Sequence, residues 1–324
     1  MKKSIDNKGK GYWGRKASLH LIKDLNCALA SLEVFQNMTG RREDRVLKSC
    51  TGLEGGMVAC GSTCGVVTGG ALGLALMHEK ALQDKGMSAE AGVLSLAGEY
   101  VRWFEKNFGS STCRKRSGVD FYTPFGQLHY FFPGDRVGKC LWHIRGAMRH
   151  LNTYQEKDLP EIDLGPKKIK GEPIHCARAV LRGIRDKTGT GDQLLERLSF
   201  VFDGGVGLQG GVCGALAGAI MGINLLLGSN IRDTSFFQTV RAFVVGHLNL
   251  LLDKPIGNPE PFCVGKTIVQ KFREKAGTIE CRSITGKAFS DWNDFQEYIS
   301  SSDICSGLIE LATIEASNAI KRLI

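Results

Sequence analysis

Apolar residues recur at three- and four-residue intervals along most of the chain, which is the spacing of an amphipathic helix. The first such run extends from Ala17 to Met38, with Gly40 as its stop signal. Further helices are predicted over residues 42–53, 64–80, 89–107, 137–151, 174–187, 193–202, 213–227, 233–252, 264–275, 288–299 and 305–322. The strict apolar–polar alternation of a half-buried strand does not stand out in any segment. The pattern therefore predicts an all-α fold.

One stretch of the chain occurs twice. Residues 54–73 read EGGMVACGSTCGVVTGGALG, and residues 203–222, which lie 149 positions later, read DGGVGLQGGVCGALAGAIMG. Farther along, Phe104–Arg114 matches Phe272–Arg282 at an offset of 168, so the second copy carries about 19 additional residues between these segments. We interpret this self-similarity as a tandem duplication.

The duplication divides the 324 residues into two domains of ordinary size. We predict a flexible basic tail over residues 1–16, a first repeat over 17–152, a proline-containing linker over 153–173 and a second repeat over 174–324. In each repeat a Gly-rich loop leads into a Cys-Gly-x-x-x-Gly helix of a helical bundle. The two bundles are expected to form a pseudo-symmetric pair, equivalent to a dimer within one chain.

Composition restricts the class of protein. Hydrophobic residues make up 43% and charged residues 23%, as in soluble globular proteins. The net charge of +9 is partly local to the basic tail, and because no nucleic-acid motif accompanies it, specific nucleic-acid binding is not expected. No apolar secretion segment follows the first lysines, and the longest apolar run, 213–227, is too short to span a membrane. We expect a cytoplasmic protein, in which eleven cysteines favour metal binding or redox chemistry over structural disulfides.

Each copy contains four cysteines in the same order. Thiolates are the ligands that iron–sulfur clusters and structural zinc require. A single buried cysteine is usually an inert packing residue, but eight that recur in duplicate point to a shared chemical role. The candidate ligands are Cys27, Cys64, Cys113 and Cys140, and Cys176, Cys213, Cys281 and Cys305. Three further cysteines, Cys50, Cys60 and Cys263, have no counterpart, and their role stays open.

Neighbouring residues are expected to support these thiolates. Cys64, Cys213 and Cys305 would each begin a helix, where the dipole and free N–H groups stabilise negative charge. The Gly-rich loops would bring backbone N–H groups towards sulfur, and the arginine after each third cysteine would offset charge. Glycines four residues apart would also let a second helix approach closely. The proposed supporting residues are Gly55, Gly56, Gly61, Gly65, Gly69 and Arg114, and Gly204, Gly205, Gly210, Gly214, Gly218 and Arg282.

Several familiar motifs are excluded. No CxxCH haem c motif occurs, and without a local CxxC pair the spacing does not name a metal. Residues 205–210 satisfy GxGxxG, but no strand is predicted before them and Val58 replaces the second glycine in the first copy. Among the histidines only His175, beside Cys176, is of interest. The aromatic-rich segment 120–133 could form a lid or an interface, but we favour a role in filling the core.

The second copy resembles the C_GCAxxG_C_C family of redox-active proteins. The resemblance rests on the four ordered cysteines and on residues 211–218, which read GVCGALAG. In the first copy Val66 stands where that motif has alanine. The resemblance covers nearly all of residues 20–320. It implies redox activity and a bound iron–sulfur cluster, with the four cysteines of each copy as ligands and one cluster per repeat.

Our leading interpretation is an electron-transfer protein that holds iron–sulfur clusters and serves a redox partner protein. One alternative is metal-free thiol–disulfide exchange between paired cysteines such as Cys64 and Cys113. Another is a zinc-stabilised helical scaffold that binds a partner. The sequence presents no acid–base constellation, so it predicts no catalytic residue, and it leaves open whether the protein is an oxidoreductase or a carrier associated with one.

Overall fold

A computed structural model describes residues 9–162, 164, 172–257 and 260–324. The first repeat contains α1 (Lys10–Asp24), α2 (Cys27–Thr39), α3 (Asp44–Ser49), the 3₁₀-helix η1 (Cys50–Leu53), α4 (Gly65–Met77), α5 (Glu79–Lys85), α6 (Met87–Phe108), α7 (Cys113–Ser117), α8 (Pro124–Phe131), α9 (Asp135–Leu151) and η2 (Asn152–Glu156). The second contains α10 (Cys176–Thr188), α11 (Gln193–Leu198), η3 (Ser199–Phe202), α12 (Gly214–Leu227), α13 (Phe236–Leu251), α14 (Pro261–Ala276), α15 (Cys281–Thr285), α16 (Trp292–Ser301) and α17 (Asp303–Lys321).

The described part of the chain is all-α, as the hydrophobic pattern predicts. Its β-type contacts are two isolated bridges, Thr63 with Thr112 and Val212 with Glu280. These bridges occupy equivalent positions in the two copies and join each Gly-rich loop to the segment before the third cysteine. None of the described helices combines the length and apolar content that a membrane span requires.

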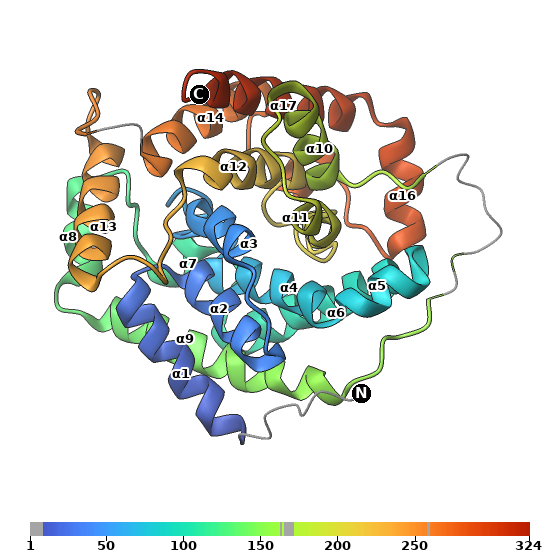
Figure 1. The fold of residues 1–324 in the computed structure, drawn as a ribbon, viewed down its shortest axis with the longest axis horizontal. Coiled ribbons are helices and arrows are strands. Elements are labelled where there is room, and N and C mark those ends of the chain that lie inside the picture. The colour runs from blue at the N-terminus through green and yellow to red at the C-terminus, as the bar shows by residue number, and fades with distance from the viewer. Residues whose placement is uncertain (1–8, 163, 165–171, 258–259) are drawn as a thin grey trace.

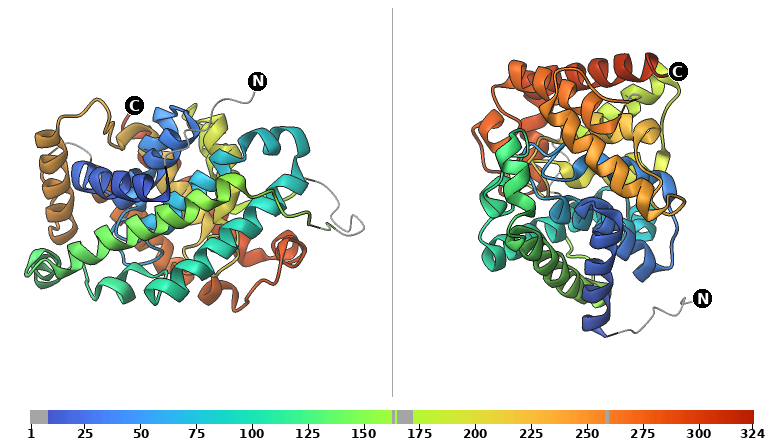
Figure 2. Two further views of the ribbon diagram at one scale, coloured as in Figure 1. Left: turned by 90° about the horizontal axis from the view of Figure 1, so that it is seen from below. Right: turned by 90° about the vertical axis from the view of Figure 1, so that its left-hand side faces the viewer.

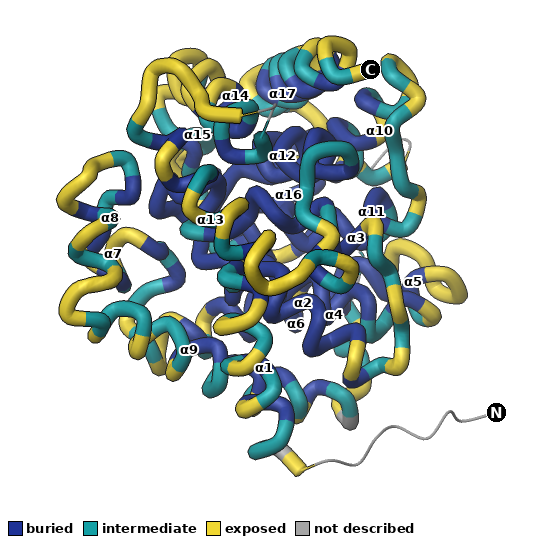
Figure 3. Tube along the Cα trace, turned by 60° about the vertical axis from the view of Figure 1, so that its left-hand side comes forward, coloured by how far each residue is buried: buried dark blue, intermediate teal, exposed yellow. Residues whose placement is uncertain are grey.

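The core is built around one apolar helix from each repeat. In the first repeat α4 packs against α2, and in the second α12 packs against both α10 and α17. Both central helices are buried along nearly their whole length (Figure 3). They also join the repeats, because α12 packs against α3 and η1 of the first repeat while α4 packs against η3 of the second (Figure 1).

The glycine stripe of α4 is the surface on which α2 packs. A Cβ atom at Gly65 would lie 2.5 Å from the Cys27 sulfur, and one at Gly69 would lie 2.5 Å from the Ala28 carbonyl oxygen. The equivalent positions of α12, Gly214 and Gly218, meet Cys176 and Ala177 in the same way. The close helix approach predicted from the glycine spacing is therefore present in both repeats.

Each Gly-rich loop is a left-handed turn. Residues 55–59 all have positive φ angles, including Met57, Val58 and Ala59, and residues 204–208 repeat this conformation. A left-handed non-glycine residue costs about 1–2 kcal/mol, so the surrounding contacts must hold the turn in place. In the first repeat Val58 packs against Gly265 of α14, and in the second Gly207 packs against Gly98 of α6. Each turn is thus held by a helix of the other repeat.

The N-terminal region differs from its prediction. The helix predicted over 17–38 is two helices, and α1 begins at Lys10, within the segment predicted as a tail. The chain breaks at Leu25, whose φ is 51°, and the Asn26 side chain then caps α2 by accepting hydrogen bonds from the N–H groups of Ala28 and Leu29. Residues 1–8 of the predicted tail, and residues 163 and 165–171 of the predicted linker, lie outside the described residues.

The aromatic-rich segment fills the core only in part, through the buried Phe121 side chain. It forms α8, whose Phe125 and Leu128 side chains are exposed. This helix lies beside α13, since Phe131 contacts Phe243 edge-on and the Gln127 amide donates to the His247 carbonyl. Both helices lie on the side of the molecule that faces the viewer in the right-hand part of Figure 2. A helix of the second repeat therefore covers part of the first.

Replacing Gly69 by alanine tests the α2–α4 contact. The new methyl group would meet backbone of α2, which cannot rotate away, so we expect a loss of about 1–3 kcal/mol in unfolding free energy. Urea unfolding measures this. Gly138→Ala on α9 is the matched control, because a Cβ there meets nothing within 4 Å and alanine favours helix. Equal stability of the two variants would contradict the role assigned to the glycine stripe.

Candidate functional site

The four cysteines of the first repeat line one cavity of about 220 Å³. Cys27 begins α2, Cys64 caps the N-terminus of α4, Cys113 begins α7, and Cys140 lies on α9. Four separate elements thus bring together residues that are far apart in sequence. The remaining wall is mainly apolar. It comes from α1, α8, α9, α13 and adjoining loop residues, with Leu21, Ile22, Leu25, Phe121, Tyr130, Phe131, Val137, Leu141 and Phe243.

Cys64 is set apart from the other thiols by its charge. A hydrogen bond from Cys27 lowers the pKa of the Cys64 thiol to about 6, although burial opposes ionisation. The Arg116 guanidinium and the N–H groups of Val66 and Val67 lower it further. All eleven cysteines are free and lie in the described part of the chain, and in the other ten burial or a neighbouring thiol raises the pKa. Among the cysteines, these contacts favour the thiolate form at Cys64.

Arg116 is the cation of the cavity. Its Nη2 donates to the Cys64 sulfur at 2.8 Å, and its guanidinium lies over the Phe104 ring and contacts His143. Burial and this nearby positive charge lower the pKa of His143 to about 4, so that imidazole is neutral. Sequence analysis missed Arg116 because its counterpart in the second copy is Ile284. Its position three residues after Cys113 on a helix was the available signal.

The predicted supporting residues occupy other places. Arg114 pairs with Asp120 at 2.9 Å and is about half exposed, and Arg282 donates to the Gln209 carbonyl. Gly61 and Gly210 provide room for these two arginine side chains. The loop N–H groups, including those of Gly61 and Gly210, bond to carbonyls of their own turn. The N–H groups that reach sulfur belong to the first turn of each central helix instead.

A buried carboxyl group and a histidine also face the cavity. Burial raises the pKa of Glu54 well above its usual value, and burial lowers that of His247 to about 4. Glu54 Oε1 lies 3.5 Å from His247 Nε2, while His247 Nδ1 bonds to the Phe243 carbonyl. Burial thus favours the neutral form of both groups. His247 belongs to α13 of the second repeat, so no repeat comparison could place it here.

His175, the histidine singled out from the sequence, has a different environment. It lies buried between Asp203, at 2.7 Å, and Glu90, at 3.1 Å. Asp203 also accepts a hydrogen bond from the Cys176 N–H. Asp203 is the counterpart of Glu54, so the same position holds a packed ion pair in one repeat and faces a cavity in the other.

The cysteines of the second repeat also converge, but around a space of only about 10 Å³. Phe289, Phe295, Ile284 and Leu308 pack around Cys176, Cys213, Cys281 and Cys305. The pKa of Cys213 is raised to about 11 by burial, even though the N–H groups of Ala215 and Leu216 point to it. With Ile284 in the position of Arg116, this site has no equivalent cation. The duplicated cysteines thus have unequal environments.

The unmatched cysteines lie outside both four-cysteine cavities. The Cys50 thiol donates to the Val46 carbonyl, and the Cys60 thiol contacts the Tyr122 hydroxyl. Cys263 is half-buried on α14. None of the three is placed to complete either group of four.

The paired arrangement agrees with a comparison of the sequence with known families. The family described as "Putative redox-active protein (C_GCAxxG_C_C)" matches residues 25–150 and again residues 174–318. The chain belongs to this family. As a C_GCAxxG_C_C protein it carries two tandem copies of the module, which confirms the resemblance noted from the motifs. No curated protein and no solved structure gives a significant match.

Ionisation of Cys64 in this C_GCAxxG_C_C protein can be followed by the ultraviolet absorbance of its thiolate. In metal-free protein we expect one thiolate to form near pH 6. Arg116→Met should raise this midpoint by at least about one unit because it removes the neighbouring charge. Arg116→Lys should restore a low midpoint, and Arg114→Met should leave it unchanged. An equal titration midpoint in wild type and Arg116→Met would contradict the role assigned to Arg116.

The same shift affects stability. Because folding lowers the pKa of Cys64 below its ordinary value of 9.0, the unfolded state binds more protons between about pH 6 and 9. The contribution of Cys64 to stability is complete above pH 9 and is lost as pH falls through 6. We expect Arg116→Met to flatten this part of the stability–pH profile.

Proposed function

We propose that the first repeat is the redox-active centre, in which Cys27, Cys64, Cys113 and Cys140 hold an iron–sulfur cluster that serves electron transfer. The observation that carries this proposal is the convergence of all four cysteines on one apolar cavity beside a buried arginine. Iron–sulfur clusters take four cysteine ligands, and a dry surrounding tunes their potential.

The spacing of the sulfur atoms disfavours the zinc scaffold. A tetrahedral zinc with ligands at about 2.3 Å requires sulfur atoms about 3.8 Å apart. Among the described residues no three cysteine sulfurs lie within 4.8 Å of one another. The cysteines thus surround a space larger than a single ion needs. A cluster distributes its thiolate ligands over several iron atoms, which suits this wider arrangement.

The chain supplies distinct contributions at this site. Cys64 is already ionised, whereas Cys27, Cys113 and Cys140 would lose protons on binding, which couples loading to pH. Arg116 would offset part of the thiolate charge, and the Tyr130 hydroxyl donates to Cys140. The bound cluster would supply one-electron exchange. The apolar wall would exclude water from it.

For the second repeat we propose a structural role. Its four thiols surround a space of about 10 Å³, and aromatic side chains complete the packing. Ile284 stands where the first repeat has Arg116. A cluster per repeat, as the motif count suggested, would require this core to open. The eleven free thiols suit a reducing compartment such as the cytoplasm. We also propose that the protein exchanges electrons with a redox partner protein.

A second candidate function is metal-free dithiol chemistry. One observation favours it: the Cys27 thiol donates a hydrogen bond to the Cys64 thiolate. In this reaction the Cys64 thiolate attacks a small disulfide and releases one thiolate. Cys27 then loses its proton and attacks the mixed disulfide, which forms the Cys27–Cys64 bond and releases the second thiol. The partner differs from Cys113, which the sequence suggested. Because Cys64 is only 1% exposed, we rank this below cluster binding.

Anaerobic reconstitution with iron and sulfide tests the proposal. We expect visible charge-transfer absorption with iron matching sulfide, and about one cluster per chain. Cys140→Ser should lose most of the cluster. Cys305→Ser, the equivalent change in the second repeat, should retain it.

Other outcomes would overturn the proposal. Equal losses in both serine variants would place clusters in both repeats. A colourless chain with stoichiometric zinc would favour the scaffold. A colourless, metal-free chain that reversibly loses two thiols on oxidation would favour the dithiol reaction, provided that the Cys27→Ser variant does not lose them.

A further inference from the structure

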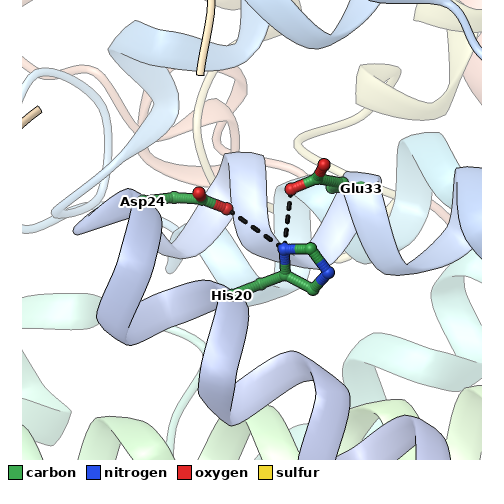
Figure 4. Close-up of side chains that lie close together, drawn as sticks. All are labelled: His20, Asp24 and Glu33. Carbon is green, nitrogen blue, oxygen red and sulfur yellow. Dashed lines mark ion pairs between the residues drawn. The ribbon is translucent and has the colours of Figure 1, made fainter. Parts of the chain in front are cut away.

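Three side chains of metal-ligand type meet between α1 and α2, outside the cysteine cavity. His20 and Asp24 lie one turn apart on α1, and Glu33 faces them from α2 (Figure 4). His20 Nδ1 is 2.7 Å from Glu33 Oε2 and 3.5 Å from Asp24 Oδ2. Among the described residues this is the one group of three or more such side chains with ligand atoms within 4.8 Å of one another.

The local sequence explains why these groups meet. Residues four apart share one face of a helix, which aligns His20 with Asp24. The left-handed residue Leu25 then turns the chain, and α2 packs back along α1. Glu33, on the second turn of α2, thereby points to the same place as the two α1 side chains.

The carboxylates at this place have few hydrogen-bond donors. The Asp24 side chain is 1% exposed, and neither of its oxygens has a hydrogen-bond partner. Glu33 Oε2 has the His20 ring as its neighbour, with Nδ1 at 2.7 Å. The Lys23 ammonium, 3.8 Å from Asp24 Oδ1, is half exposed. One imidazole N–H cannot satisfy two carboxylates, and buried charged groups without partners are costly.

Neighbouring side chains contact the atoms of Glu33 and His20 that point away from the other candidate ligands. Arg232 Nε bonds to the other oxygen of Glu33, at 3.2 Å, and its Nη2 bonds to Gln36. The Asn37 amide lies 3.4 Å from His20 Nε2. The amide nitrogen of Asn37 faces Nε2. When the amide is turned over, its oxygen instead accepts a hydrogen bond from Nε2–H, which leaves Nδ1 without a proton. Such outer contacts orient metal ligands in proteins.

We propose that His20, Asp24 and Glu33 bind a divalent transition-metal cation of the Mn²⁺ type. One imidazole nitrogen and two carboxylates form a ligand set for such ions, with open positions for water. Ligand atoms at about 2.1 Å from a metal stand about 3.0–3.4 Å apart, and the two nitrogen–oxygen distances lie on either side of this range. The ion would take the place of a proton on His20 Nδ1, which lies 2.7 Å from Glu33 Oε2 and 3.5 Å from Asp24 Oδ2.

The position of the site gives the ion a structural consequence. It would join α1 to α2 next to Leu21, Ile22 and Leu25, which line the cysteine cavity. Bound metal would therefore hold α1 in place as one wall of that cavity. This site shares no ligand with the four cysteines, so metal binding to it can be measured on a chain that holds no cluster.

Mn²⁺ binding to the full-length chain, free of iron and sulfide, tests the site. The electron paramagnetic resonance signal of aqueous Mn²⁺ decreases on binding, and thiols compete weakly for this hard ion. We expect one tight Mn²⁺ per wild-type chain and at least about tenfold weaker binding in Asp24→Asn and His20→Gln. Asp233→Asn, which changes an exposed carboxylate, is the matched control and should bind as wild type.

Thermal unfolding distinguishes loss of the metal site from misfolding of a variant. Mn²⁺ should raise the melting temperature of the wild type and of Asp233→Asn, but not that of Asp24→Asn. The far-ultraviolet circular dichroism of metal-free Asp24→Asn should match wild type. Equal Mn²⁺ affinity in wild type and both ligand variants, or no stoichiometric binding by wild type, would leave an ion-pair network and overturn the proposal.

Discussion

The close approach of α2 to α4 is the constraint on which the cysteine site depends. Only a bare helix face at Gly65 and Gly69 lets the α2 backbone come near enough to place the Cys27 sulfur beside the N-terminus of α4. There the sulfur meets Cys64, whose thiolate already receives two helix N–H groups. Packing and electrostatics are therefore joined in one contact, and the glycine spacing is as much a part of the site as the cysteines.

The same contact exists in both repeats, yet it leads to two different sites. In the first repeat Arg116 lies against the thiolate and a cavity remains; in the second, Ile284 and two phenylalanines pack the space. Loss of the cation raises the cost of a buried thiolate, and apolar filling removes room for a ligand. Duplication thus preserved the helical framework while only one copy kept an environment suited to charge.

The fold class, the repeats and the order of the cysteines could be predicted because each rests on local periodicity or on a match between the copies. Residues without a counterpart could not. Arg116 aligns with an isoleucine when the two copies are compared. His247 reaches the cavity from a helix of the other repeat. The exposed aromatic residues of α8 were placed in the core because composition alone does not reveal α13 beside them. The break before α2 was detectable, since Asn26 is a favoured helix cap.

The cover that α13 provides over the first cavity links the two halves of the chain energetically. Phe243 and His247 form part of the cavity wall, so any local opening of the second repeat would admit solvent to the thiolate. A ligand that fills the cavity would conversely favour the closed form of both repeats by mass action. The lifetime of the buried centre is then set by the cooperativity of the whole chain, although all four of its cysteines come from one half.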